Sequence, residues 1–184
     1  MRTGSSCIET ASSSTACSTD LSRIAVISDT HLPRGTRRLP DECLRRLEAA
    51  DIILHCGDFV STTVLHELRA LGPVEGVYGN MDESALKEHL PERRVVEVDG
   101  VRIGMVHIPG PRVGREARLA SSFPGCHAVV YGHTHEPARS QHGDLWILNP
   151  GSPTERRRAP MRAMIWLEAE AEAGRFHAQV VPLP

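Results

Sequence analysis

The sequence lacks the features that mark several classes of protein. No apolar run approaches the roughly 18 residues of a membrane-spanning helix. Residues 1–20 lack the apolar central stretch of a secretory signal, so export is not indicated. The formal net charge is −2, so the chain has no basic excess of the kind that neutralises the phosphates of bulk duplex nucleic acid. We therefore expect neither a membrane protein nor a protein that binds long nucleic acids.

The cysteines lack a pairing pattern. Cys7, Cys17, Cys43, Cys56 and Cys126 are scattered and form no C-x-x-C pair. An odd, scattered set predicts reduced thiols and a cytoplasmic protein rather than a disulfide framework. Cys56 lies inside an apolar segment, and we expect it to be a small buried hydrophobic residue.

The remaining composition is that of an ordinary globular protein. Of the 184 residues, 40% are apolar and 24% are charged, and this length suits one domain with a sizeable core. Residues 1–22 are rich in Ser and Thr without apolar periodicity, and we predict a disordered leader there. We predict a single domain over residues 23–184, because this part has no internal repeat and no dividing linker.

The first half of the chain alternates strand and helix patterns. Apolar strand patterns cover residues 23–28, 51–56 and 73–79, and helix patterns cover residues 40–50, 61–72 and 83–90. Ser61 is the predicted N-cap of the middle helix, and Gly72 is its predicted end. Repeats of strand, helix and strand with short links imply right-handed crossovers and a parallel sheet covered on both faces.

The second half has a different pattern. Residues 93–107 alternate apolar and polar types on either side of Asp99-Gly100, which is typical of a tight antiparallel hairpin. A helix is predicted over residues 113–123 and a buried strand over residues 127–132. We assign residues 145–149, 161–170 and 175–183 to a second, largely antiparallel sheet. The natural packing of these elements is an α/β fold of two sheets with helices outside them.

Five clusters of metal-type ligands follow apolar strand patterns in sequence order. They are Asp29-Thr30-His31, Gly57-Asp58, Gly79-Asn80-Met81-Asp82, His107 and Gly132-His133-Thr134-His135. Open sheets present ligands at strand ends, so clusters far apart in sequence can converge in space. The set is large enough for two divalent metals and has no thiolate, which favours a catalytic site over a structural one.

Each cluster alone has an ordinary explanation. Residues 29–31 could be a helix-capping loop, and His107 could be a packed or surface histidine. Gly57-Asp58 and Gly79-Asn80 could each be a turn. His133 and His135 are the least ordinary pair, because residues i and i+2 share one side of an extended chain and both imidazoles can then reach one centre. The conjunction of all five is far less probable by chance than any one of them.

The order and spacing of these clusters resemble the calcineurin-like metallophosphoesterase family, whose motifs read D-x-H, G-D, G-N-x-D, H and G-H-x-H. The small bacterial and archaeal phosphodiesterase subgroup is the most similar, through stretches such as HCGDFVS (55–61), VVYGHTHEP (129–137) and LNPGS (148–152). The resemblance covers residues 23–183. It implies an αββα fold of two sheets flanked by helices. It also implies hydrolysis of phosphodiesters, and possible hydrolysis of phosphomonoesters, by a hydroxide that bridges two metal ions.

The resemblance also implies roles for individual residues. Asp29, His31 and His135 would hold one metal, Asn80, His107 and His133 would hold the other, and Asp58 would bridge the two. Two cations ~3.5–4 Å apart lower the pKa of a bridging water and clamp phosphoryl oxygens. The expected catalytic residues are Asp58, Asn80, Asp82 and His107. We expect manganese first, with nickel, cobalt, zinc, iron and magnesium left open, because this ligand set selects poorly among such ions.

The chain departs from the family pattern at two positions. Many relatives have a histidine that protonates the leaving oxygen where this chain has Met81, so poor alkoxide leaving groups should react slowly. The fourth motif, often H-G-H, reads His107-Ile108-Pro109-Gly110 here and is followed by Arg112, Arg115 and Arg118. We expect Arg112 and Arg115 to contact a substrate phosphate; the alternative is a solvated helix start.

The expected protein is a cytoplasmic, metal-dependent phosphoesterase. Its expected partner is a small phosphoester, with nucleic acid limited to nucleotide-type substrates and a homo-oligomer left open. The alternative is an interaction scaffold of the same fold, as in the retromer subunit of this family; scaffolds usually lose ligands, whereas all seven are present here. We interpret Arg156-Arg157-Arg158 as a solvated loop and Asn149-Pro150-Gly151-Ser152 as a turn under the site.

Overall fold

The computed structural model of the chain describes residues 21–170 and 175–184. The leader predicted over residues 1–22 lies outside the described residues, except for its last two. These two, Leu21 and Ser22, are the first residues of strand β1 (Leu21–Ile27), so the strand begins earlier than its apolar run indicates. Among the described residues, no helix has the length and apolar character that crossing a membrane requires.

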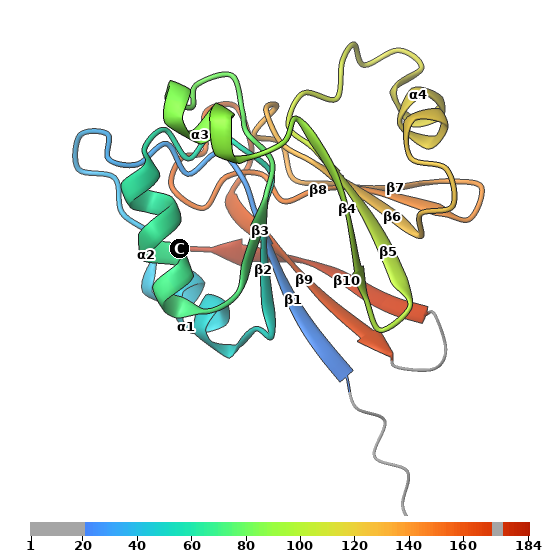
Figure 1. Cartoon of the computed structure of the whole chain (residues 1–184), viewed down its shortest axis with the longest axis horizontal. Coiled ribbons are helices and arrows are strands. Elements are labelled where there is room, and N and C mark those ends of the chain that lie inside the picture. The colour runs from blue at the N-terminus through green and yellow to red at the C-terminus, as the bar shows by residue number, and fades with distance from the viewer. Residues whose placement is uncertain (1–20, 171–174) are drawn as a thin grey trace, which may run out of the picture.

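The first sheet has five strands in the order β10-β9-β1-β2-β3. Its parallel part consists of β1, β2 (Ile52–His55) and β3 (Val74–Gly76), as the alternating first half predicts. Helices α1 (Asp41–Ala49) and α2 (Thr62–Leu71) connect these strands and pack on the outer face of the sheet (Figure 1). The Oγ of Ser61 accepts a hydrogen bond of 3.2 Å from the backbone N–H of Thr63, which confirms Ser61 as the N-cap of α2.

The second sheet has five strands in the order β4-β5-β6-β8-β7. Strands β4 (Arg93–Val98) and β5 (Val101–Val106) form the predicted antiparallel hairpin, and the turn residues Asp99 and Gly100 have φ angles of 50° and 76°. Strand β6 (Ala128–Tyr131) pairs in parallel with both β5 and β8 (Leu145–Asn149). Helix α4 (Arg115–Ser122) covers the outer face of this sheet, where Leu119 packs in one cluster with Val129 and Ile147.

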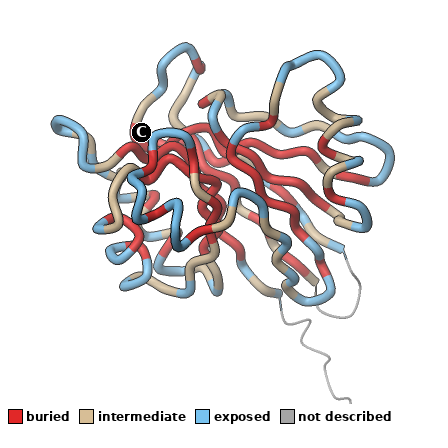
Figure 2. Tube along the Cα trace, turned by 45° about the horizontal axis from the view of Figure 1, so that its top comes forward, coloured by how far each residue is buried: buried red, intermediate tan, exposed pale blue. Residues whose placement is uncertain are grey.

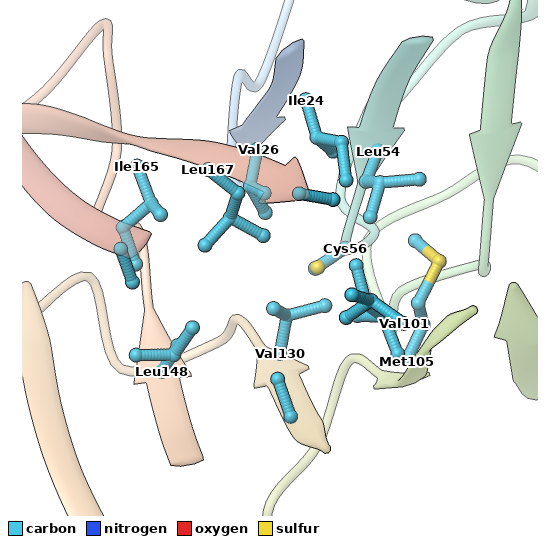
Figure 3. Packing of buried hydrophobic residues seen from close by; sticks show 14 of the residues in the cluster. Ile24, Val26, Leu54, Cys56, Val101, Met105, Val130, Leu148, Ile165 and Leu167 are labelled. Carbon is cyan, nitrogen blue, oxygen red and sulfur yellow. The ribbon is translucent and has the colours of Figure 1, made fainter. Parts of the chain in front are cut away.

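The two sheets pack face to face, and a fully buried apolar layer lies between them. In Figure 3, Ile24, Val26 and Leu54 of the first sheet point toward Val130 and Leu148 of the second. Cys56 lies in this layer and is fully buried, as predicted. With helices outside each sheet, the molecule has the expected αββα layers.

Two strand predictions are wrong. Strands β9 (Arg162–Glu170) and β10 (Arg175–Leu183) were assigned to the second sheet, yet β9 pairs antiparallel with β1 and β10 pairs with β9 in the first sheet. The apolar alternation of a strand indicates two faces but says nothing about its partner. Strand β7 (Ala138–His142) was not predicted, because this edge strand is polar and largely exposed and gives no apolar signal.

Polar residues are buried beyond the carboxyl ends of β1, β2, β3, β5 and β6. Figure 2 shows the strands as buried layers with exposed loops around them. Several loop residues nevertheless have no more than 4% of their surface exposed: Asp29, Thr30, His31, Asp58, Asp82, His107 and His135. Buried polar groups need partners, so their concentration at one place indicates a functional site.

Candidate metal centre

Asp29, His31 and His135 form a buried corner of the site. The Nε2 of His135 lies 3.1 Å from Asp29 Oδ1 and 3.3 Å from the Nε2 of His31. All three residues lie in the loops that follow β1 and β6, and they are at most 2% exposed. Their ligand atoms all lie within 4.8 Å of one another, close enough to surround one ion.

Asn80, His107 and His133 form an open corner. The Oδ1 of Asn80 lies 3.0 Å from His133 Nδ1 and 3.2 Å from His107 Nε2. His107 is buried, whereas Asn80 and His133 are exposed. This corner therefore faces solvent on one side.

Asp58 lies between the two corners. Its Oδ1 is 3.3 Å from His107 Nε2 in the open corner, and its Oδ2 is 3.6 Å from His31 Nε2 in the buried corner. One carboxylate thus presents one oxygen to each corner. The structure brings all seven predicted ligands together, and this arrangement of Asp58 is what a bridging ligand needs.

The hydrogen bonds around these side chains leave lone pairs directed at the centre. The Nδ1 of His107 lies 2.7 Å from the carbonyl oxygen of Cys56, to which it can only donate. A neutral His107 therefore carries a lone pair on Nε2, which faces Asp58. Asp29 Oδ2 accepts hydrogen bonds from Ser28 Oγ and from the backbone N–H of His133, while its buried Oδ1 accepts none. Converging unpaired acceptors fit divalent cations.

The loops that carry the ligands are tied to one another. The backbone N–H groups of Asp29 and His31 each donate a 3.0 Å hydrogen bond, to the carbonyl oxygens of Gly57 and Asp58 respectively. Gly132 donates likewise to the carbonyl oxygen of His107. The strand ends within each sheet are thereby held in register, and the hydrogen bond of 2.9 Å from the backbone N–H of His133 to Asp29 Oδ2 joins the loops of the two sheets.

Several ligand residues have backbone conformations that side chains usually avoid. Positive φ angles of 47–70° occur at five of the seven predicted ligands, namely Asp29, His31, Asp58, His133 and His135. Such angles cost free energy in residues other than glycine and cluster at functional sites. Glycine is required where backbones approach closely: a Cβ on Gly79 would lie 2.1 Å from Asp58 Oδ1, and one on Gly132 would lie 2.0 Å from Ser28 Oγ.

The electrostatics keep the carboxylates ionised. Burial alone would raise the pKa of Asp58, but the hydrogen bond and charge of the protonated form of His107, together with the backbone N–H of Met81, lower it to about 2. Burial likewise opposes the charged form of Asp29, but the imidazole of His135, 3.1 Å from its Oδ1, and the charge of His107 bring its pKa below the usual value. Ionised carboxylates are the form that binds metal ions.

Asp82, a predicted catalytic residue, is turned toward the backbone. Its carboxylate accepts hydrogen bonds from the backbone N–H groups of Gly79 (2.7 Å), Val60 (2.7 Å) and Asp58 (3.2 Å). Burial raises the pKa of Asp82 in spite of these donors. Asp82 thus ties the loop of Asp58 to the loop of Asn80. Met81, beside it, is 43% exposed.

The predicted phosphate-binding arginines differ in their surroundings. Arg112 is exposed. The guanidinium of Arg115 lies over the ring of Tyr131 and donates to the carbonyl oxygen of Gly110, and that of Arg118 donates to the carbonyl oxygens of Pro109 and Pro111. Arg115 and Arg118 therefore brace the loop that precedes α4.

The sequence reasoning missed Glu155 and Arg157. Glu155 Oε1 lies 3.5 Å from His135 Nδ1, and the Nη2 of Arg157 lies 3.4 Å from His31 Nε2. The turn at residues 149–152 does lie under the site, as expected, and Ser152 Oγ donates a 2.7 Å hydrogen bond to the carbonyl oxygen of Asp29. No signal marked residues 155–157, because a short charged stretch resembles any solvated loop.

His55 supports the site from below. It is fully buried and stacks on Phe59, and it accepts a hydrogen bond at Nδ1 from the backbone N–H of Gly57. Its Nε2 then carries the proton and faces Thr30 Oγ1 at 3.1 Å. Burial lowers the pKa of His55 to about 3, so it stays neutral.

A cavity opens beside the open corner. Its volume is about 340 Å³, and it is lined by Tyr78, Asn80, Lys87, Glu92, His107 and Ile108 among others. Its walls combine apolar side chains with one cation and one anion. A group attached to a phosphate at the metal centre could be accommodated there.

Comparisons with known proteins show the family to which the chain belongs. Residues 23–172 match the family described as the calcineurin-like phosphoesterase superfamily domain. A probable metallophosphoesterase of Methanocaldococcus jannaschii is 34% identical over 163 residues, which are 87% of this chain and 81% of that protein. A phosphodiesterase of the same organism is 31% identical over 141 residues, or 70% of this chain and 82% of that protein.

A solved structure has the same fold. Vps29 from Entamoeba histolytica, crystallised in complex with Zn²⁺, superposes with a TM-score of 0.65 at 25% identity, covering 87% of this chain and 98% of that chain. The family match extends over most of the described residues, from β1 to the end of β9. On this match and on the relatives above, the chain belongs to the calcineurin-like phosphoesterase superfamily.

Proposed function

We propose that the protein is a dinuclear metal-dependent phosphoesterase that hydrolyses phosphodiesters and also accepts phosphomonoesters. The observation that carries this proposal is the position of Asp58, whose two carboxylate oxygens face His107 and His31 in different corners. The M. jannaschii relative named as a phosphodiesterase supports the choice of diesters.

Asp29, His31 and His135 would hold one metal, Asn80, His107 and His133 would hold the second, and Asp58 would be shared. Two such cations would supply an acidified water as the nucleophile and would neutralise charge on the phosphoryl group. Manganese is our first choice, with nickel, cobalt, zinc, iron and magnesium as the others, because nitrogen and oxygen ligands of this kind accept several first-row ions.

The residues of the chain contribute preorganisation. The hydrogen bond from His107 Nδ1 to the carbonyl oxygen of Cys56 fixes the orientation of the imidazole. The backbone N–H of Met81 donates a 2.8 Å hydrogen bond to Asp58 Oδ1 and holds that carboxylate in place. The thioether of Met81 transfers no proton, so the leaving oxygen must depart as an anion or take its proton from solvent.

The organic part of the substrate would lie in the cavity beside Asn80 and His107. Lys87 donates a 3.3 Å hydrogen bond to the carbonyl oxygen of Asn80, which places its cation at the wall shared with the open corner. A cavity of about 340 Å³ suits a group of nucleoside or aryl size. We propose a small phosphoester, not a polymeric nucleic acid, as the substrate.

A cytoplasmic location and reduced thiols remain part of the proposal. Cys43, Cys56 and Cys126 are free cysteines within the described residues, in keeping with it. A homo-oligomer is left open.

The test is a panel of aryl phosphomonoesters and phosphodiesters. Metal-stripped protein is reloaded separately with manganese, nickel, cobalt, zinc, iron and magnesium, and its metal content is measured in the same samples. We expect two equivalents of metal and turnover of diesters with at least one ion. Protein that binds two metals and hydrolyses none of the esters would overturn the proposal and would favour the interaction scaffold.

A further inference from the structure

Arg157 reaches the metal centre, although its sequence context predicts a solvated loop. Its Nη2 lies 3.4 Å from His31 Nε2, and its Nε lies 3.0 Å from Glu155 Oε1. Its side chain is 48% exposed, so the guanidinium borders both the buried corner and solvent. The side chains of Arg156 and Arg158 are exposed and make no hydrogen bond or ion pair with residues that the structure describes.

Glu155 holds this guanidinium in place. Its side chain is only 14% exposed, and its Oε2 forms an ion pair with Arg37. Its Oε1 faces Arg157 and also lies 3.5 Å from His135 Nδ1. A carboxylate fixed from two sides leaves Arg157 few orientations, and a preorganised guanidinium loses little freedom when it binds an anion.

The loop that carries both residues is anchored to the ligand loop. Ser152 Oγ donates a hydrogen bond of 2.7 Å to the carbonyl oxygen of Asp29, and Thr154 Oγ1 donates one of 2.8 Å to that of Thr30. The backbone N–H of Glu155 donates to Ser152 Oγ at 3.2 Å. The position of Glu155 and Arg157 is thus coupled to that of Asp29, as a built site requires and a free surface loop does not.

His31 Nε2 can accept a hydrogen bond from Arg157 or bind a metal ion, but it cannot do both. His31 Nε2 has a single lone pair, and a metal in the buried corner needs that lone pair. Arg157 then keeps its contact with Glu155 through Nε and has Nη2 free for another acceptor beside the buried corner. An oxygen of a phosphoryl group at the centre would be such an acceptor, since guanidinium groups form strong, charge-assisted hydrogen bonds with phosphate.

We infer that Arg157 is a phosphate-binding residue of this site and that Glu155 is its positioning residue. The inference rests on the proposed function, since it assumes that phosphate lies at the metal centre. It also predicts that the site prefers phosphomonoesters and inorganic phosphate to diesters. A phosphomonoester has three non-bridging oxygens and up to two charges, whereas a diester has two and one, so an additional cationic donor strengthens binding of monoesters and inorganic phosphate more than binding of diesters.

The test compares Arg157→Gln with Arg156→Gln and Arg158→Gln, which make the same change in net charge at the two adjacent positions. Binding of inorganic phosphate to the metal-loaded proteins is measured by calorimetry, with metal content and thermal melts as controls. A charge-assisted hydrogen bond of this kind corresponds to roughly 10- to 100-fold in affinity. We expect Arg157→Gln to weaken phosphate binding by about that factor and the two control variants to stay within about twofold.

A second variant, Arg157→Lys, and a comparison of KM values test the inference further. We expect Lys to restore part of the phosphate affinity, because the charge returns without the planar pair of donors. We also expect Arg157→Gln to raise KM for an aryl monoester more than KM for the matching diester. Phosphate affinity in Arg157→Gln equal to that in Arg156→Gln would overturn the inference, and equal changes in KM for both esters would overturn the monoester preference. Wild-type protein that binds phosphate through Arg157 but hydrolyses nothing would instead refute the proposed function.

Discussion

The buried and open corners of the metal centre differ in both solvent access and charge. Asp29, His31 and His135 supply a carboxylate and two imidazoles that are nearly inaccessible to water. In the open corner the corresponding oxygen ligand is the neutral amide of Asn80, and His133 is exposed. A buried site with a negative ligand should hold a divalent ion more tightly and exchange it more slowly than an exposed site with an amide. The two proposed metals are therefore expected to be inequivalent, with the weaker one beside the cavity that Lys87 and Glu92 line.

A substitution of Asp58 should have the largest effect, because its carboxylate faces both corners. Asp58→Asn keeps the shape and removes the charge, so we expect both metals to bind more weakly and turnover to fall by at least ~10²-fold. The matched control is Asp99→Asn, which makes the same change in an exposed turn whose positive φ suits Asn. Metal analysis and turnover are measured on both variants. Two equivalents of metal with near-normal turnover in Asp58→Asn would remove Asp58 from the shared position.

Substitutions of His133 and His135 distinguish the two corners, because His133 belongs to the open corner and His135 to the buried one. We expect His135→Ala to lose the metal of the buried corner and His133→Ala to lose only the weaker metal, so each variant should retain about one equivalent while its fold survives. Because the buried corner should bind more tightly, the ion left in His133→Ala should resist a chelator longer than the ion left in His135→Ala. Elemental analysis, chelator kinetics and a thermal melt measure this, with the exposed His142→Ala as control. Both variants retaining two equivalents would refute the assignment.

Met81 tests whether chemistry at the open corner lacks a proton donor. The wild-type rate should fall steeply as the pKa of the leaving group rises, since each ~1.4 kcal/mol of lost stabilisation is a tenfold change in rate. Met81→His introduces an imidazole at a half-exposed position and should speed alkyl diesters by up to about 10²-fold while changing nitrophenyl diesters little. Met81→Leu is the control. A flat wild-type series, with chemistry limiting the rate, would mean that another residue already donates the proton.

The sequence predicts the corners better than their surroundings. Asp29 and Asp58 lie just after β1 and β2, and these parallel strands bring such positions to one edge of the first sheet, so local pattern was enough to collect them. His107 follows β5 of the second sheet and meets them because the two sheets pack face to face. The positive φ angles of Asp29 and Asp58 could not be predicted from the sequence, because the surrounding fold imposes this strain. The same limit applies to Glu155 and Arg157, whose contacts depend on a loop anchored through Ser152. It applies as well to β9 and β10, whose alternation fixes their faces but not their sheet.

His55 gives the smallest expected effect and tests whether the support under the buried corner is neutral. Its pKa is about 3 in the folded protein, lowered by burial, against an ordinary value of 6.5. The unfolded chain therefore takes up a proton below pH 6.5 that the folded chain refuses, so the stabilising contribution is complete above about pH 6.5 and is lost as the pH falls toward 3. Between these two pH values, a difference of one bound proton changes the free energy of unfolding by up to about 1.4 kcal/mol per pH unit.

His55→Gln removes this titration, so its stability should decline less steeply with falling pH than that of the wild type, whatever its stability at neutral pH. The measurement is chemical unfolding of metal-free protein at several pH values between 4 and 7. His66→Gln, in the exposed face of α2, is the matched control and should keep the wild-type slope. If His55→Gln also keeps that slope, His55 takes up its proton in the folded state, and the neutral hydrogen bond to Thr30 would have to be replaced by a charged one.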